Sequence, residues 1–175
     1  MKISTGLTAT LTAAVLLVGA PVGVMSAMAA DDATAAAQAA NKRAQRAIAT
    51  RQGALKLLGF YMGPLGGMAR GKIPMDVAVV ERNAGHIAAL APIVGDTFAL
   101  DTSNTDLATE ALPVIWTKPN EFAAKGQALW EKATALVEIA KTNADGKNER
   151  AIKGGIGALG QACGSCHEDF RVDDE

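Results

Sequence analysis

The residues best suited to chemistry in this sequence form one short motif, Cys163-Gly164-Ser165-Cys166-His167, near the end of the 175-residue chain. Its two cysteines are the only cysteines in the sequence. Two thiols three positions apart and followed by a histidine are typical of c-type haem attachment, in which each sulfur bonds to a haem vinyl group and the histidine ligates the iron. On a helix these three side chains share one face, so a single rigid turn can hold both tethers and the ligand.

Three other uses of a Cys-x-x-Cys pair stay open, and the sequence disfavours each. A redox disulfide of the thioredoxin type follows a strand, but no strand pattern precedes Cys163. A structural zinc site needs four Cys or His ligands, and only His86 lies outside the motif. A disulfide across so short a loop would limit the entropy of the unfolded chain little. The motif therefore predicts one covalent haem c per chain, with His167 as the metal ligand.

The first 30 residues have the pattern of a secretory signal peptide. Lys2 supplies the charged start, residues 11–18 form a short apolar run, and residues 27–29 (Ala-Met-Ala) form a cleavage site. The run is shorter than the roughly 20 apolar residues of a spanning helix. We therefore expect a cleaved signal peptide at residues 1–30 and a mature domain at 31–175. Export fits haem c, so the expected location is the periplasm, with no membrane association after cleavage.

Composition limits the partners and the number of domains. Removal of residues 1–30 takes away one lysine and no acid, which leaves 16 lysines plus arginines against 18 acids and a net charge of −2. This balance argues against a nucleic-acid partner. With 49% hydrophobic residues, the chain suits one domain with a real core.

Helical periodicity in four stretches, with no alternating strand pattern, predicts an all-α fold. The expected helices are residues 31–70, 75–94, 120–141 and 147–171. Each carries an apolar stripe at steps of three and four, and a short connection makes the last two neighbours antiparallel. We therefore predict an antiparallel four-helix bundle with covalently attached haem c near the C-terminus.

Two features interrupt this helical pattern. Pro64 lies within the first helix and should bend or loosen its end, which Gly71 and Pro74 then terminate. Residues 95–118 lose the periodicity and cluster polar residues and prolines, so they predict a long crossing loop.

A haem motif at the C-terminal end of a four-helix chain resembles cytochrome c′, the class II c-type cytochromes. The likeness rests on four segments: Arg51-Gln52-Gly53-Ala54-Leu55, Gly71-Lys72-Ile73-Pro74, Pro113-Val114-Ile115-Trp116 and Cys163–Arg171. The resemblance implies that His167 is the fifth iron ligand. It also implies that Arg51 lies near the haem propionates and that Arg171 lies beside the imidazole.

Leu55 matters most for the function that the resemblance implies. Low-spin members of class II carry a methionine at this position as the sixth iron ligand, and a leucine has no lone pair to offer. The resemblance therefore implies five-coordinate, high-spin iron. A hydrocarbon pocket offers little to dioxygen and suits nitric oxide and carbon monoxide better. Met62, seven residues further along roughly the same stripe, stays open as an alternative ligand.

We therefore expect a protein that binds small gaseous ligands and is not an enzyme, because no distal acid and base pair is recognisable. The alternative is a one-electron carrier between a periplasmic donor and acceptor. The resemblance also implies a homodimer that packs through the first two helices. His86, Trp116 and Trp130 are expected to be packing or surface residues rather than ligands.

Overall fold

The computed structural model describes residues 22–172, with side chains from residue 32 onward. The chain divides into two compact units, Met1–Gln38 and Ala39–Glu175. Most of the predicted signal peptide lies outside the described residues. The described part of the first unit is helical, and the second unit contains the cysteine motif.

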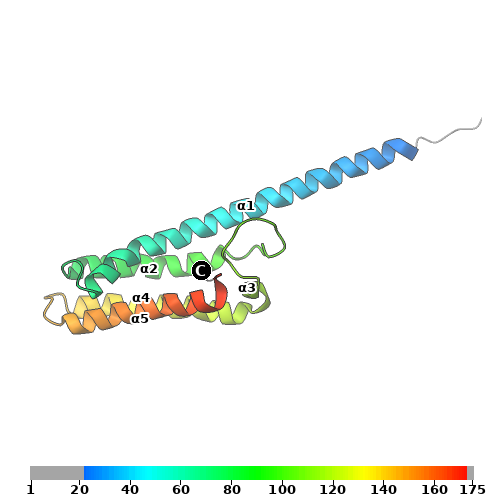
Figure 1. Ribbon diagram of the computed structural model, residues 1–175. Coiled ribbons are helices and arrows are strands. Elements are labelled where there is room, and N and C mark those ends of the chain that lie inside the picture. The colour runs from blue at the N-terminus through cyan, green and yellow to red at the C-terminus, as the bar shows by residue number, and fades with distance from the viewer. Residues whose placement is uncertain (1–21, 173–175) are drawn as a thin grey trace, which may run out of the picture. The chain divides into compact units, whose positions relative to one another are not determined.

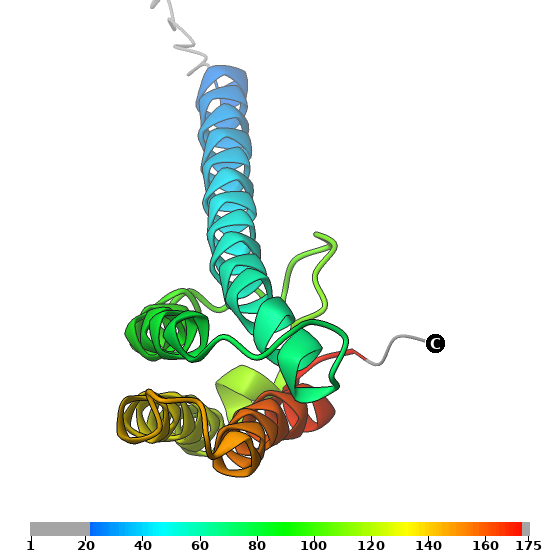
Figure 2. The ribbon, with the colours of Figure 1, turned by 90° about the vertical axis from the view of Figure 1, so that its left-hand side faces the viewer.

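The described residues form helices and no β-strand, which confirms the all-α prediction. The helices are α1 (Val22–Ala69), α2 (Val77–Asp96), α3 (Val114–Thr117), α4 (Pro119–Thr142) and α5 (Glu149–Phe170). Within the second unit, α1, α2, α4 and α5 lie alongside one another and successive long helices run in opposite directions (Figure 1). Figure 2 looks along the bundle from the end where α1 finishes and α5 begins. The four-helix bundle is therefore present as predicted.

Helix α1 differs from its prediction mainly at the start, and it ends one residue before the predicted end. It begins at Val22 rather than at residue 31, because the alanine-rich stretch across this boundary favours a helix. It also continues through Pro64 to Ala69. Two hydrogen bonds then end it as a Schellman motif, from Lys72 N to the Gly67 carbonyl (2.9 Å) and from Gly71 N to the Met68 carbonyl (3.0 Å). Gly71 has φ +67°, which a glycine adopts without strain.

The crossing segment, the connection predicted over residues 95–118, is only partly a loop. Helix α2 begins after Asp76, whose side chain accepts a hydrogen bond from Val79 N at 3.1 Å, and it ends at Asp96. The prediction of an uninterrupted loop over residues 95–118 was wrong for its last part, where α3 forms after Pro113. Pro113 already has helical torsion angles (φ −57°, ψ −24°). A helix of four residues is too short to produce a periodicity in the sequence.

The apolar stripes of the four long helices meet in one core. Its buried members are Leu65 and Met68 of α1, Val80, Ala84 and Ile87 of α2, Ala133, Leu136 and Ala140 of α4, and Ile152, Ile156 and Leu159 of α5. Helix α2 is long and apolar enough to cross a membrane by length and composition. Its apolar face supplies part of this core, and a core helix of a bundle passes the same test.

Helix α5 ends at Phe170, one residue before its predicted end. Arg171 is extended (φ −119°, ψ 146°) and forms an isolated antiparallel bridge with Ala111 of the crossing segment. The bridge contains hydrogen bonds from Leu112 N to the Phe170 carbonyl (3.0 Å) and from Val172 N to the Glu110 carbonyl (2.8 Å). The cysteine motif thus lies in the last two turns of a helix whose end is joined to the crossing segment.

Candidate functional site

A cavity of about 1080 Å³ lies next to the core. Its walls come from α1, α2, α4, α5 and the crossing segment, and most of the lining side chains are apolar. The stripes that fill the core at one end of the bundle therefore continue as cavity walls at the other. Its volume lies slightly above the range of about 300–1,000 Å³ that is usual for small-molecule and cofactor sites.

The predicted haem motif forms the α5 wall of this cavity. Cys163, Cys166 and His167 all line it; the cysteines are half-buried and His167 is exposed. The motif continues the buried stripe of Ile156 and Leu159, as the three-and-four spacing predicted. One helix face therefore presents two thiols and an imidazole to the same apolar space.

The environment of the thiols argues against the redox alternative. Burial raises the pKa of Cys163, and burial is also the main cause of the raised pKa of Cys166. A reactive Cys-x-x-Cys pair instead has a lowered thiol pKa, commonly at a helix N-terminus, whereas this pair lies near a helix C-terminus. In the part of the chain that the structure describes, no group of three or more His, Cys, Asp or Glu residues could hold a metal, so the zinc alternative has no support there either.

The α1 wall contains Leu55, the residue on which the expected gas binding depends. Leu55 lines the cavity with 39% of its surface exposed, and Leu58 and Met62 line it further along the same stripe. The stripe that was predicted to face the core thus faces the cavity at these positions. Leu55, at the position where the resemblance places a sixth ligand in low-spin members, and Met62, the alternative ligand, both belong to this wall.

Arg51 is buried one turn before Leu55, with only 2% of its surface exposed. Its guanidinium donates to the side chain of Thr102 at 3.2 Å and to the carbonyls of Thr97 (3.4 Å) and Leu100 (3.5 Å). Burial lowers the pKa of Arg51. Among the described residues its hydrogen-bond acceptors are all uncharged, and its Nε has no acceptor.

Two aromatic rings of the cavity wall pack against the Arg51 guanidinium. The guanidinium carbon lies 4.2 Å from the centroid of the Phe98 ring and 5.2 Å from that of Trp116, and both rings line the cavity. Trp116 also donates from Nε1 to the Phe98 carbonyl at 2.9 Å. Arg51 itself does not line the cavity, but it contacts these two residues that do.

Arg171 lines the cavity together with His167 and is the residue at the C-terminal cap of α5. It follows the last residue of α5, and its backbone N–H donates to the His167 carbonyl at 3.0 Å. Its side chain forms an ion pair with Glu110, with Nε 3.0 Å from Oε2. The last hydrogen bond of α5 and the bridge to the crossing segment therefore both hold Arg171 in place.

Several lining residues were not assigned to the site from the sequence. Phe98 and Glu110 lie in the crossing segment, where no periodicity marked them. The sequence could have indicated Lys125, because this residue lies between Phe122 and Leu129 on the predicted apolar stripe of α4. His86 does not line the cavity; it is exposed and stacks on Tyr61 with ring centroids 4.6 Å apart, as expected of a surface histidine.

These features fit a covalently attached haem. The cavity is wide, mostly apolar and lined by two thiols and one imidazole from adjacent turns of a helix, which is the donor set that haem c requires. Against one wall lies a buried guanidinium with an unused Nε donor, which suits a carboxylate such as a haem propionate. The residues would hold the cofactor by Cys163 and Cys166.

The family model for cytochrome C′ matches residues 46–171, which include every residue of the candidate site. The chain belongs to the cytochrome c′ family. Its similar relatives include cytochrome c-554 of Cereibacter sphaeroides, 36% identical over 135 residues that cover 76% of this chain and 85% of the relative. Cytochrome c′ of the same organism is 35% identical over 140 residues, covering 79% and 89%.

Solved structures of the family share the fold. A cytochrome c prime from Shewanella frigidimarina has a TM-score of 0.66 at 33% identity, covering 74% of this chain and 97% of the other. A nitric oxide complex of a variant of cytochrome c prime from Alcaligenes xylosoxidans has a TM-score of 0.62 at 23% identity, covering 75% and 97%. The second likeness concerns the fold alone. With the family known, the motif attaches one haem c through Cys163 and Cys166.

Proposed function

We propose that this member of the cytochrome c′ family is a periplasmic gas-binding protein. His167 is the axial iron ligand in this proposal, and Leu55 covers the opposite face without ligating. When bound, the haem supplies an iron that can hold a diatomic gas on that face. The observation that carries the proposal is the presence of Leu55, a side chain with no donor atom, on the α1 wall of the cavity that His167 lines.

The chemistry of the walls supports a preference among gases. Besides Leu55, the apolar residues on the α1 and α2 sides of the cavity include Leu58, Ile87 and Ala91, and Gln52 and Lys56 also line the α1 side. The apolar side chains carry no hydrogen-bond donor for a polarised dioxygen complex, whereas nitric oxide and carbon monoxide need less such help. We therefore propose nitric oxide and carbon monoxide as the ligands.

Two arginines complete the proposed site. Arg51 would pair with a haem propionate, which would give its guanidinium the charged partner that the described residues do not provide. Arg171 would lie beside the His167 imidazole, because both line the same cavity. Glu110 holds the Arg171 side chain from the crossing segment.

Electron transfer is the second candidate, and one observation favours it. Trp130 lines the cavity and has 43% of its surface exposed, so this wall is open to solvent and could bring a haem edge close to a redox partner. The relatives include a cytochrome c-554 as well as cytochromes c′. Ligation separates the two functions, since a permanent sixth ligand suits electron transfer and an open position suits gas binding.

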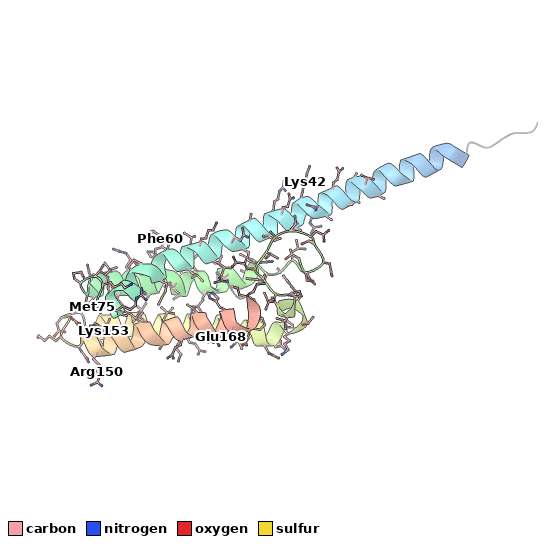
Figure 3. All side chains as sticks on the ribbon, in the orientation of Figure 1. Lys42, Phe60, Met75, Arg150, Lys153 and Glu168 are labelled. Carbon is pink, nitrogen blue, oxygen red and sulfur yellow. The ribbon has the colours of Figure 1, made fainter. Side chains whose placement is uncertain are left out.

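We also propose that the protein is a homodimer and not an enzyme. Leu57 and Phe60 lie on the outer side of α1 with 47% and 70% of their surfaces exposed, and an apolar surface of this kind suits a subunit contact. Figure 3 shows Phe60 directed away from the other helices.

The deciding experiment is an absorption spectrum of the reduced holoprotein before and after carbon monoxide. A high-spin spectrum that shifts on addition of the gas is the expected result. A sharp low-spin spectrum that the gas leaves unchanged would reject the open site and favour the electron carrier.

A further inference from the structure

Two ion pairs beside the haem motif differ from the others in the described residues. Four of the pairs join residues two to four positions apart: Lys118–Glu121, Lys141–Glu138, Lys147–Asp145 and Lys153–Glu149. The other two join distant segments. Lys125 Nζ of α4 lies 2.7 Å from Asp169 Oδ2 of α5, and Arg171 pairs with Glu110 of the crossing segment. Both long-range pairs hold residues that follow His167 by two to four positions.

Lys125 occupies an unusual place for a lysine. It lines the apolar cavity on the α4 stripe, and its side chain is only 27% exposed. The aliphatic stem of a lysine can cover such a wall while the ammonium group reaches a polar partner. Here the partner is Asp169, which is 55% exposed. The pair therefore ties the cavity wall of α4 to the last turn of α5.

The last turn of α5 is the part of that helix that most needs support. Its final carbonyls have no partners within the helix, and helix ends open more readily than helix centres. His167 lies in this turn and is exposed. A contact that restrains Asp169 also restrains the turn from which the imidazole projects. The Glu110–Arg171 pair supports the same region from the crossing segment.

We propose that Lys125 is a positioning residue of the haem site: its ion pair with Asp169 holds the last turn of α5 and thereby sets the position of the His167 imidazole. The inference rests on the proposed role of His167 as axial ligand. Because the pair is partly exposed, salt weakens it.

Three variants separate this role from others. Lys125→Met keeps the aliphatic stem and removes the charge, Asp169→Asn breaks the pair but leaves the lysine charge at the cavity, and Lys125→Arg keeps a cation. The matched control is Lys153→Met, which breaks the 2.9 Å pair with Glu149 near the start of the same helix. Figure 3 labels Lys153 and Glu168 towards opposite ends of α5.

The primary measurement is the iron–imidazole stretching band of the ferrous holoprotein by resonance Raman spectroscopy. We expect Lys125→Met and Asp169→Asn to shift the band to lower frequency, and Lys125→Arg and Lys153→Met to leave it in place. Salt at about 1 M should shift the wild-type band in the same direction, because the Debye length falls to about 3 Å. Backbone amides of residues 168–171 should exchange roughly two to five times faster in the first two variants, the effect of losing one partly exposed ion pair.

Three results would overturn the inference. Faster amide exchange with an unchanged band would mean that the pair supports the helix alone. A band shift in Lys125→Met without one in Asp169→Asn would mean that the lysine acts through its own charge at the cavity. A wild-type spectrum without an iron–imidazole band would reject the five-coordinate iron of the proposed function, and this failure is visible before any variant is compared.

Discussion

The Cε methyl of Met62 lies 3.7 Å from the point that a Cβ on Gly160 would occupy. Helices α1 and α5 run antiparallel (Figure 1). Leu55 precedes Met62 by seven residues on α1, and His167 follows Gly160 by seven residues on α5. Each separation is about two helical turns, or about 10 Å, and both lead in the same direction because the helices are antiparallel. Leu55 is therefore level with His167, whereas Met62 is level with Gly160.

This alignment predicts different results for two substitutions on one helix. Leu55→Met should convert the reduced protein to a mainly low-spin spectrum, because a thioether would then lie opposite the imidazole. If the methionine occupies the sixth position about 90% of the time, the affinity for carbon monoxide should fall about tenfold. Met62→Leu is the control and should change neither spectrum nor affinity. Loss of a low-spin signal in Met62→Leu would identify Met62 as the ligand instead.

Covalent attachment predicts how the haem responds to extraction. Acidified acetone should remove no haem from the mature wild-type protein, because the two thioether bonds of Cys163 and Cys166 retain it. The double substitution of both cysteines by serine should release all of it, and mass spectrometry should give the mass of the polypeptide alone. A wild-type polypeptide without porphyrin mass would contradict the haem assignment.

Arg51 predicts a stability effect that extends beyond the cofactor. Arg51→Met removes the donor to the buried Thr102 side chain and to two partly buried carbonyls, so the free energy of unfolding should fall by about 2–4 kcal/mol. Arg51→Lys should recover only part of this, because an ammonium group cannot reproduce the planar set of donors. Urea titration of the holoproteins measures both changes. The exposed Arg46→Met is the control on the same helix, and an equal effect there would contradict the role of the Arg51 contacts.

Alanine substitutions at two adjacent glycines of α5 should change the free energy of unfolding in opposite directions. A Cβ on Gly155 would lie 2.9 Å from Leu136 Cδ1 and 3.0 Å from Ile139 Cδ1 of α4, and Leu136 is fully buried. Gly155→Ala should therefore lower the free energy of unfolding by about 1 kcal/mol despite the better helix propensity. Gly154→Ala meets no described atom within 4 Å and should raise it by about 0.5–1 kcal/mol. Thermal unfolding compares the two; equal effects would contradict the close helix contact.

The exposed apolar face of α1 predicts concentration-dependent assembly. Phe60→Glu should convert the proposed dimer into a monomer, because a buried unpaired carboxylate opposes the contact. Sedimentation velocity over a range of concentrations measures the change. Ala124→Glu places the same charge on the exposed side of α4 and should leave the assembly unchanged. A wild-type protein that is monomeric throughout would reject the dimer.

The sequence by itself determined the fold class, the helical faces and the cofactor motif. Helical periodicity depends on side chains three and four positions apart, so the stripes through Val80, Leu136 and Ile156 could be predicted locally, as could the placement of Cys163 and Cys166 on the α5 stripe. The N-cap at Asp76 and the end at Gly71 also follow from local rules.

Only the tertiary structure decided which parts of those stripes fill the core and which line the cavity. Periodicity does not distinguish Leu55 from Leu65, because both positions face inwards. Only the distances between the helices decide that Leu65 fills the core and that Leu55 lines the cavity. The partners of Arg51, the ion pair of Lys125 and the bridge at Arg171 join segments that are far apart in the chain. Such contacts depend on how the crossing segment folds across the bundle, and no local pattern of residues encodes that path.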